Sequence, residues 1–412
     1  MTDQPRSFLR WREIPGGVWA LGLVSLFMDV SSEMIHALLP LYLVTVLGTS
    51  TLTVGIIEGV AEATASITKV FSGALSDYLG KRKWLAAAGY GLAALTKPVF
   101  PMASSVGWLV AARFVDRIGK GIRGAPRDAL IADLTPVGLR GSAYGMRQSL
   151  DAAGAVLGPL LAVVFMAALA NDFTAVFWIA VIPAFISFAI IVFGVREPER
   201  PADLRQVTAP FSRAELARLN ITYWMAVGVS AIFTLARFSE AFLLLRAQSA
   251  GLPVAVVPMV LVVMFIAYTA SAWPAGALSD RVGRYGMIVA GFVLLMVADL
   301  LLALGTEVLT VMIGVALWGL HMGLTQGLLA ALIADAAPAE LRGTAFGVFN
   351  LVSGVALLAA SIIAGALWDA IGPAGTFLAG AAFTAVALAT LPFVRWRTRR
   401  ITSQSSAASP RG

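Results

Sequence analysis

Residues 73–83 read Gly-Ala-Leu-Ser-Asp-Tyr-Leu-Gly-Lys-Arg-Lys, and residues 276–286 read Gly-Ala-Leu-Ser-Asp-Arg-Val-Gly-Arg-Tyr-Gly. The two stretches open with the same five residues, 203 positions apart in a chain of 412 residues. Each follows one long apolar segment and precedes another. A second related pair, at residues 131–145 and 333–347, recurs at an offset of 202. The repetition indicates parallel duplication of one unit, which gives two related halves.

The composition places these halves in a membrane. Apolar residues make up 59% of the chain and charged residues 13%, whereas soluble domains carry about 25% charged residues. The chain has no cysteine, which excludes disulfides and thiolate metal or redox sites. The net charge of +7 is explained by Lys and Arg in cytoplasmic loops, so we expect no nucleic-acid partner.

Apolar runs of about 20 residues or more, long enough to cross a bilayer, recur along the chain. They predict an all-α integral membrane protein with twelve transmembrane helices, at residues 17–47, 54–76, 84–103, 107–134, 143–169, 174–195, 221–247, 252–276, 286–305, 308–336, 344–368 and 374–394.

The positions of the basic residues indicate how these spans are oriented in the membrane. They gather in alternate connections, which places both termini in the cytoplasm and the protein in the inner, or cytoplasmic, membrane. The predicted domains are a cytoplasmic N-terminus (1–16), an N-terminal six-helix bundle (17–195), a cytoplasmic linker (196–220), a C-terminal six-helix bundle (221–394) and a cytoplasmic tail (395–412).

The repeated turns carry a family signature, G-x-x-x-D-R/K-x-G-R-R/K. The first copy matches at Gly73, Asp77, Gly80, Lys81 and Arg82, with Tyr78 departing at a basic position. The second copy matches at Gly276, Asp280, Arg281, Gly283 and Arg284. Two shorter signatures follow: R-x-x-x-G at Arg117 and Gly121, and G-x-x-x-G-P at Gly154, Gly158 and Pro159.

On these motifs the chain resembles the major facilitator superfamily from about residue 15 to 395. The resemblance implies two pseudo-symmetric six-helix bundles that alternate access to a central cavity, and the Gly-Pro signature favours export. It also implies that Asp77 latches one conformation by pairing with Arg140 and the start of the next span. We therefore expect a gating loop formed by Gly73, Asp77, Gly80, Arg82, Arg140, Gly276, Asp280, Gly283, Arg284 and Arg342.

Charges inside the spans differ between the halves. The span at 107–134 carries Arg113, Asp116, Arg117, Lys120, Arg123, Arg127 and Asp128, and most of them lie on one helical face because they are three or four residues apart. A structural salt-bridge network is one interpretation. The other is substrate binding, in which basic groups hold an anion. The candidates are Lys120, Arg123, Arg127, Arg117, His36, Arg147 and Gln326.

Acidic residues in neighbouring spans indicate proton coupling. Asp29 and Glu33 lie near the middle of the first span, and Glu58 and Glu62 lie four residues apart in the second. Burial disfavours the charged form of a carboxyl group, so such groups can carry a proton across the membrane. We expect no cofactor and a proton or ion gradient as the energy source.

The sequence thus predicts a secondary active transporter for a small organic solute, acting as a monomer in the lipid bilayer. It contains no nucleotide-binding loop and no Ser/His/Asp set on an extramembrane domain, so we do not expect an enzyme. Two alternatives stay open. One is efflux of a divalent metal such as nickel or iron through Asp29, Glu33, His36, Glu58 and Glu62, although a dedicated metal site is not expected. The other is a non-transporting receptor or lipid scramblase.

Overall fold

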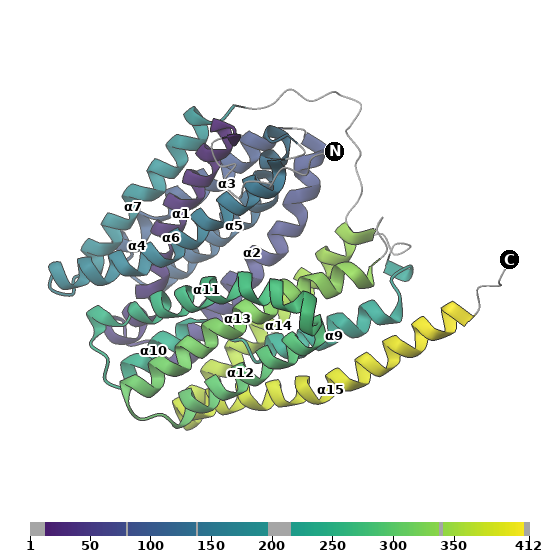
Figure 1. Ribbon diagram of the computed structural model, residues 1–412. Helices are drawn as coiled ribbons and strands as arrows, with labels where there is room; N and C mark the ends of the chain where they lie inside the picture. The colour runs from purple at the N-terminus through teal and green to yellow at the C-terminus, as the bar shows by residue number, and fades with distance from the viewer. Residues whose placement is uncertain (1–12, 80, 137–138, 197–215, 338–340, 408–412) are drawn as a thin grey trace. The chain divides into compact units, whose positions relative to one another are not determined.

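The computed structural model describes residues 13–79, 81–136, 139–196, 216–337 and 341–407. In these ranges the regular structure is helical, without strands, which confirms the all-α class (Figure 1). The first half of the chain forms α1 (Gly16–Leu41), η2 (Tyr42–Val46), α2 (Thr51–Leu79), α3 (Arg82–Thr96), α4 (Val99–Met102), α5 (Val106–Leu134), α6 (Arg140–Ala168), α7 (Phe173–Ala189) and η4 (Ile190–Gly194). The second half forms α9 (Ile221–Leu235), α10 (Ala241–Ser249), η6 (Val254–Val256), α11 (Met259–Val282), α12 (Arg284–Leu304), α13 (Val308–Ala336), α14 (Arg342–Ile371) and α15 (Pro373–Ala407).

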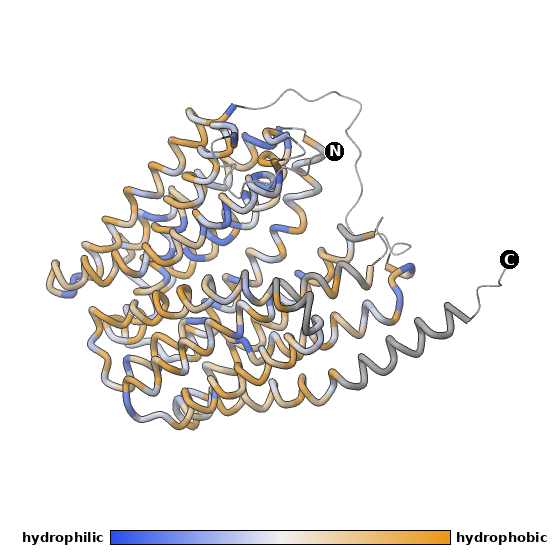
Figure 2. Tube along the Cα trace, in the orientation of Figure 1, coloured by the Kyte–Doolittle hydropathy of each residue, from blue (hydrophilic) through white to orange (hydrophobic). Residues whose placement is uncertain are grey.

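Eight helices of the described chain are long and apolar enough to cross a membrane: α1, α6, α7, α11, α12, α13, α14 and α15, some with an adjoining short turn. The chain is therefore a multi-pass membrane protein, and Figure 2 shows hydrophobic residues along most of its helical trace. The other expected spans are shorter or more polar. The helices α3 and α9 have 15 residues each, while α2 and α5 carry several charged side chains.

Two of the expected spans are interrupted. The span expected at 221–247 breaks between α9 and α10, where Ser361 accepts a hydrogen bond from the freed backbone N–H of Ser239. The span expected at 84–103 breaks between α3 and α4 at Pro98, which has no N–H to donate to a helical hydrogen bond. A broken membrane helix is tolerated where other groups satisfy its backbone, as Ser361 does in the first case.

The chain forms two compact units. Unit 1 comprises Met1–Leu39 with Thr64–Thr208, and unit 2 comprises Pro40–Ala63 with Ala209–Gly412. In unit 1, α3 packs against α5 and α7, and in unit 2, α12 packs against α13 and α15. The helix α2 is shared, because its first residues belong to unit 2 and the remainder to unit 1.

The first turns of α2 are fastened to α14 within unit 2. The carboxylate of Asp369 accepts hydrogen bonds from the backbone N–H groups of Thr51 (3.1 Å) and Leu52 (3.0 Å) and from the Thr51 hydroxyl. A carboxylate at a helix N-terminus satisfies free N–H groups and complements the helix dipole. A Cβ on Gly365 would lie 2.7 Å from the Leu52 Cα, so the two helices meet at backbone distance.

Glycines also bring helices of unit 1 into direct backbone contact. A Cβ on Gly119 of α5 would lie 2.7 Å from the carbonyl oxygen of Gly89 on α3. A Cβ on Gly158 of α6 would lie 2.7 Å from the Glu33 Cβ and 2.9 Å from the Val30 carbonyl oxygen on α1. Small residues at such crossings let membrane helices approach closely. These contacts position the polar faces of α1, α5 and α6.

Candidate substrate and coupling site

The basic face of α5 is buried in unit 1. Side chains of Arg113, Asp116, Arg117, Arg123 and Arg127 are all buried, in agreement with the helical spacing of the sequence. Lys120, expected on the same face, is exposed. Between residues 113 and 128 this helix carries five basic and two acidic residues, so the face has an excess of positive charge.

The sequence did not reveal an ion pair that lies on this face. The Nζ atom of Lys97, just after α3, lies 2.9 Å from the Asp116 Oδ1 and donates to the Ser32 hydroxyl at 3.0 Å. Only 1% of Lys97 is exposed. Arg117 also approaches this carboxylate, with 3.5 Å between its Nε and the Asp116 Oδ2. Asp116 thus serves as counter-charge to two cations.

Arg123 has a different environment. Its guanidinium carbon lies 4.9 Å from the centre of the Tyr90 ring, and 4% of the residue is exposed. Among the described residues its Nη1 has no hydrogen-bond partner. A guanidinium stacked on an aromatic ring keeps its edge free for hydrogen bonds. Arg123 is therefore a buried cation with unused donor capacity.

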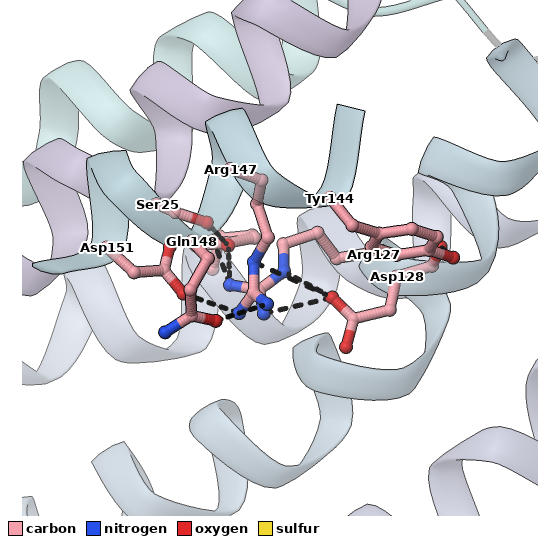
Figure 3. Close-up of polar contacts among 8 residues, drawn as sticks. Ser25, Arg127, Asp128, Tyr144, Arg147, Gln148 and Asp151 are labelled. Atoms are coloured by element: carbon pink, nitrogen blue, oxygen red, sulfur yellow. Dashed lines mark hydrogen bonds and ion pairs between the residues drawn. The ribbon is translucent and has the colours of Figure 1, made fainter. Parts of the chain in front are cut away.

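Arg127 is fully engaged in a network between α1, α5 and α6 (Figure 3). Its Nη1 donates to the Ser25 hydroxyl at 2.7 Å, and its Nη2 lies 3.0 Å from the Asp128 Oδ1. The Nε of Arg147 on α6 lies 3.8 Å from the same Asp128 oxygen. Figure 3 marks the ion pairs of both arginines with dashed lines. Tyr144 donates to the Asp128 carbonyl at 2.7 Å. Through its hydrogen bond to Ser25, Arg127 joins α5 to α1.

Asp151 of α6 pairs with Arg147 and has a second carboxyl group, that of Asp29, in its neighbourhood. The Arg147 Nη2 lies 2.5 Å from the Asp151 Oδ2, while the Asp151 Oδ1 has no hydrogen-bond partner among the described residues. Asp29 on α1 lies near enough for its charge to act on Asp151. A Cβ on Gly154 would lie 2.9 Å from the Asp29 Cβ, so the Gly-x-x-x-Gly-Pro motif makes this approach possible. Asp151 is a coupling candidate that was not singled out from the sequence.

The other predicted acidic residues belong to different units. On α1, the Glu33 Oε2 lies 3.6 Å from the His36 Nδ1. Glu58, which is fully buried, and Glu62 lie on the part of α2 that belongs to unit 2, whereas Asp29 and Glu33 belong to unit 1. No group of three or more potential metal ligands comes together in the part of the chain that the structure describes.

The gating loop is only partly described. Arg82 donates to the Ala129 carbonyl at 3.0 Å and pairs with the Asp133 Oδ2 at 2.8 Å, which joins the start of α3 to the end of α5. Gly283 has φ +86°, a conformation that favours glycine. Gly73 lies within α2 and Arg140 is exposed. Gly80 and the side-chain positions of Asp77, Gly276, Asp280, Arg284 and Arg342 lie outside the described parts of the structure.

Unit 2 offers fewer charged groups. Gln326 on α13 is half-buried. His321, one turn earlier, is fully buried with ring centres of Trp318 and Phe233 at 5.4 and 6.2 Å. Asp299 on α12 is also fully buried and was missed in the sequence, although it is the one acidic residue in the apolar run 284–304.

Comparison with known proteins identifies this arrangement of helices. The sequence pattern of the Major Facilitator Superfamily matches residues 21–257 and 227–411. The chain belongs to the major facilitator superfamily (MFS). An uncharacterised MFS-type transporter of Methanocaldococcus jannaschii is 34% identical to it over 391 residues, which cover 93% of this chain and 96% of that protein.

More distant relatives agree with this assignment. The inner membrane transport protein YajR of Escherichia coli is 26% identical over 391 residues, covering 89% of this chain and 81% of YajR. The solved structure of the nucleoside transporter NupG has the same fold, with a TM-score of 0.74 at 12% identity over 92% of this chain and 99% of NupG. As an MFS transporter, the chain is not an enzyme, and its partners are a small-molecule solute and the membrane.

Proposed function

We propose that this MFS transporter exports a small organic solute that carries an anionic group, driven by a proton gradient. The supporting observation is Arg123, a buried guanidinium with an unused Nη1 donor on a helical face rich in positive charge. The proposal includes alternating access, action as a monomer and a cytoplasmic membrane location with both termini inside. Export rather than uptake is favoured by the Gly154, Gly158 and Pro159 motif.

The three cations predicted to bind the anion have unequal environments. Arg127 is engaged with Ser25 and Asp128, and Lys120 is exposed, so Arg123 is the principal anion-binding residue in this proposal. A charge-assisted hydrogen bond from a guanidinium to a carboxylate or phosphate is about twice as strong as a neutral one. Tyr90, which holds the Arg123 guanidinium by stacking, acts as its positioning residue.

Thermal stability measurements can identify the chemical class of the solute. We expect small organic anions from a chemical library to raise the melting temperature of the purified protein, and their neutral amide or ester analogues not to. A ligand at 100 times its Kd stabilises a protein by about 2.7 kcal/mol. We expect Arg123→Ala to abolish this shift because the unused donor is lost.

The control for this measurement is Arg196→Ala, which removes the same charge from an exposed position outside the helices. It should leave the anion-induced shift intact. An Arg123→Ala protein that folds and still shows the full shift would contradict the role of Arg123. Equal shifts from anions and from their neutral analogues would contradict the anionic substrate class itself.

Proton coupling is assigned to Asp29 and Asp151, since Asp151 pairs with Arg147 and the charge of Asp29 also acts on it. Two neighbouring carboxylates repel one another, which favours retention of a proton by the pair. Because Arg147 belongs to this pair and contacts Asp128, we assign it to coupling and not to the substrate. Glu33, Glu58 and Glu62 remain secondary candidates.

Flux in proteoliposomes should separate coupling from binding. With a solute found by thermal shift, we expect a pH gradient to drive uphill movement in the wild-type protein. Asp29→Asn and Asp151→Asn should each reduce the gradient-driven flux at least tenfold, while downhill exchange of the solute continues. The matched control is Asp172→Asn, at the exposed N-cap of α7. If both variants respond to the gradient as the wild type does, the coupling assignment is wrong.

The two alternatives receive less support from the geometry. A divalent metal would need several ligands in one place, and the described residues hold no such group. A lipid scramblase needs an opening that lipid can enter from the side of the helix bundle, and the density of buried charge on α5 disfavours one. Metal sensitivity of a deletion strain, and loss of lipid asymmetry in vesicles that contain the protein, would be the results in their favour.

A further inference from the structure

Asp299 on α12 is a carboxyl group whose burial the proposed site does not explain. Its exposed fraction is 0%, and neither of its oxygens has a hydrogen-bond partner among the residues that the structure describes. It belongs to unit 2, whereas Asp29 and Asp151 belong to unit 1. It is therefore a titratable group apart from the coupling pair.

The carboxyl group lies against α15 where that helix has no side chain. A Cβ on Gly380 would lie 2.7 Å from the Asp299 Oδ2 and 3.2 Å from the Phe238 ring. The nearby Thr384 hydroxyl donates to the Gly380 carbonyl at 3.0 Å. Gly380 thus provides the space for the carboxyl group, in surroundings of aromatic and aliphatic side chains.

No described charged group on the neighbouring helices compensates Asp299. Residues 373–391 of α15 contain no charged residue. On α13, His321 contacts the Trp318 and Phe233 rings, and Glu307 precedes this helix at an exposed position. Arg246 of α10 donates instead to the Leu302 and Gly305 carbonyls at the end of α12. Arg237, which precedes Phe238, has Glu240 as its charged neighbour. Asp280 and Arg281 at the far end of α11 have side chains outside the described parts.

The physical cost of this arrangement decides the protonation state. Removing an ion from water without a counter-charge costs far more free energy than removing a neutral carboxyl group that lacks a hydrogen-bond partner. The buried group therefore keeps its proton. Ionisation requires that water reach it, which requires that α12 and α15 separate near Gly380.

We propose that Asp299 is a proton-binding site of unit 2, which holds a proton while α15 covers it and exchanges that proton with water when the contact at Gly380 opens. The role in transport rests on the proposed function, whereas the opening of the contact at Gly380 is a thermal fluctuation within unit 2 that needs no solute and no gradient. The binding of the proton does not depend on the solute. It can be tested in the resting protein.

Infrared spectroscopy of the purified protein in lipid nanodiscs is the direct test. At neutral pH we expect a carbonyl stretch of a protonated carboxylic acid that is absent from the spectrum of Asp299→Asn. On raising the pH, this wild-type band should disappear while tryptophan fluorescence still reports a folded protein. Identical spectra for the two proteins at neutral pH would overturn the proposal. So would a band that persists until unfolding, because the group would then be neutral but unable to exchange its proton.

Two further variants keep the test decisive. Gly380→Ala retains Asp299 but adds a methyl group 2.7 Å from its Oδ2, so the band should shift in frequency. Asp369→Asn is the matched control, because this carboxylate accepts hydrogen bonds and should contribute no such band. An unshifted band in Gly380→Ala would contradict the placement of the proton on Asp299. Since no solute or gradient is present, failure here is distinguishable from failure of anion binding or of gradient-driven flux.

Discussion

Replacing Asp116 with leucine is expected to destabilise the protein by about 3–5 kcal/mol, because it leaves a buried cation without its counter-charge. Lys97, 1% exposed, would keep its hydrogen bond to the Ser32 hydroxyl but lose the carboxylate. Replacing Lys97 with methionine should cost less, since Arg117 stays 3.5 Å from the Asp116 carboxylate. The free energy of unfolding in mixed micelles measures both effects.

The double variant separates charge pairing from packing. Lys97→Met together with Asp116→Leu removes both charges, and we expect it to be more stable than Asp116→Leu alone. Lys81→Met, at the exposed N-cap of α3, is the control for loss of a lysine and should change stability little. If Asp116→Leu unfolds like the wild type, then Asp116 does not neutralise Lys97 and the ion pair has no structural importance.

Replacing Gly158 with valine is expected to destabilise the protein by about 1–3 kcal/mol, the usual cost of overpacking. The added Cβ alone would lie 2.7 Å from the Glu33 Cβ and 2.9 Å from the Val30 carbonyl oxygen. Because one neighbour is backbone, α1 and α6 must separate to admit the side chain. That separation would also part Asp29 from Asp151, so gradient-driven flux should fall together with the melting temperature.

Gly145→Ala is the control on the same helix, since a Cβ at that position would meet nothing within 4 Å. We expect it to be neutral or to stabilise the protein by up to about 1 kcal/mol, the helix-propensity difference between glycine and alanine. Equal effects of the two substitutions would show that the Gly158 contact is not tight. If Gly158→Val lost stability without any loss of coupled flux, the contact between α1 and α6 would not be needed to position the coupling pair.

The repeated turn and the glycine motif predicted a large part of the architecture. The duplication at residues 73 and 276 led to the superfamily, and the spacing of basic residues on α5 predicted a face that is buried apart from Lys120. Both are local properties, because turns and helical periodicity depend on residues that are close together in the chain. The close contact of Gly158 with α1 explains why the G-x-x-x-G-P motif has glycine at this position.

The sequence did not reveal which charges meet. Lys97 follows a long apolar run and precedes Pro98, and it was not recognised because its partner Asp116 lies on another helix. Tyr90 belongs to the candidate site for a similar reason, through its contact with Arg123 on another helix. Such pairings depend on how helices cross, which is a tertiary property that residue spacing within one helix does not contain.

The helix α2 is held by two separate sets of hydrogen bonds. Its first turn is bound by Asp369 of α14 within unit 2, while further along Ser72 donates to the Gly121 carbonyl of α5 at 2.8 Å within unit 1. The first turn of α2 and its later turns are therefore secured independently of one another.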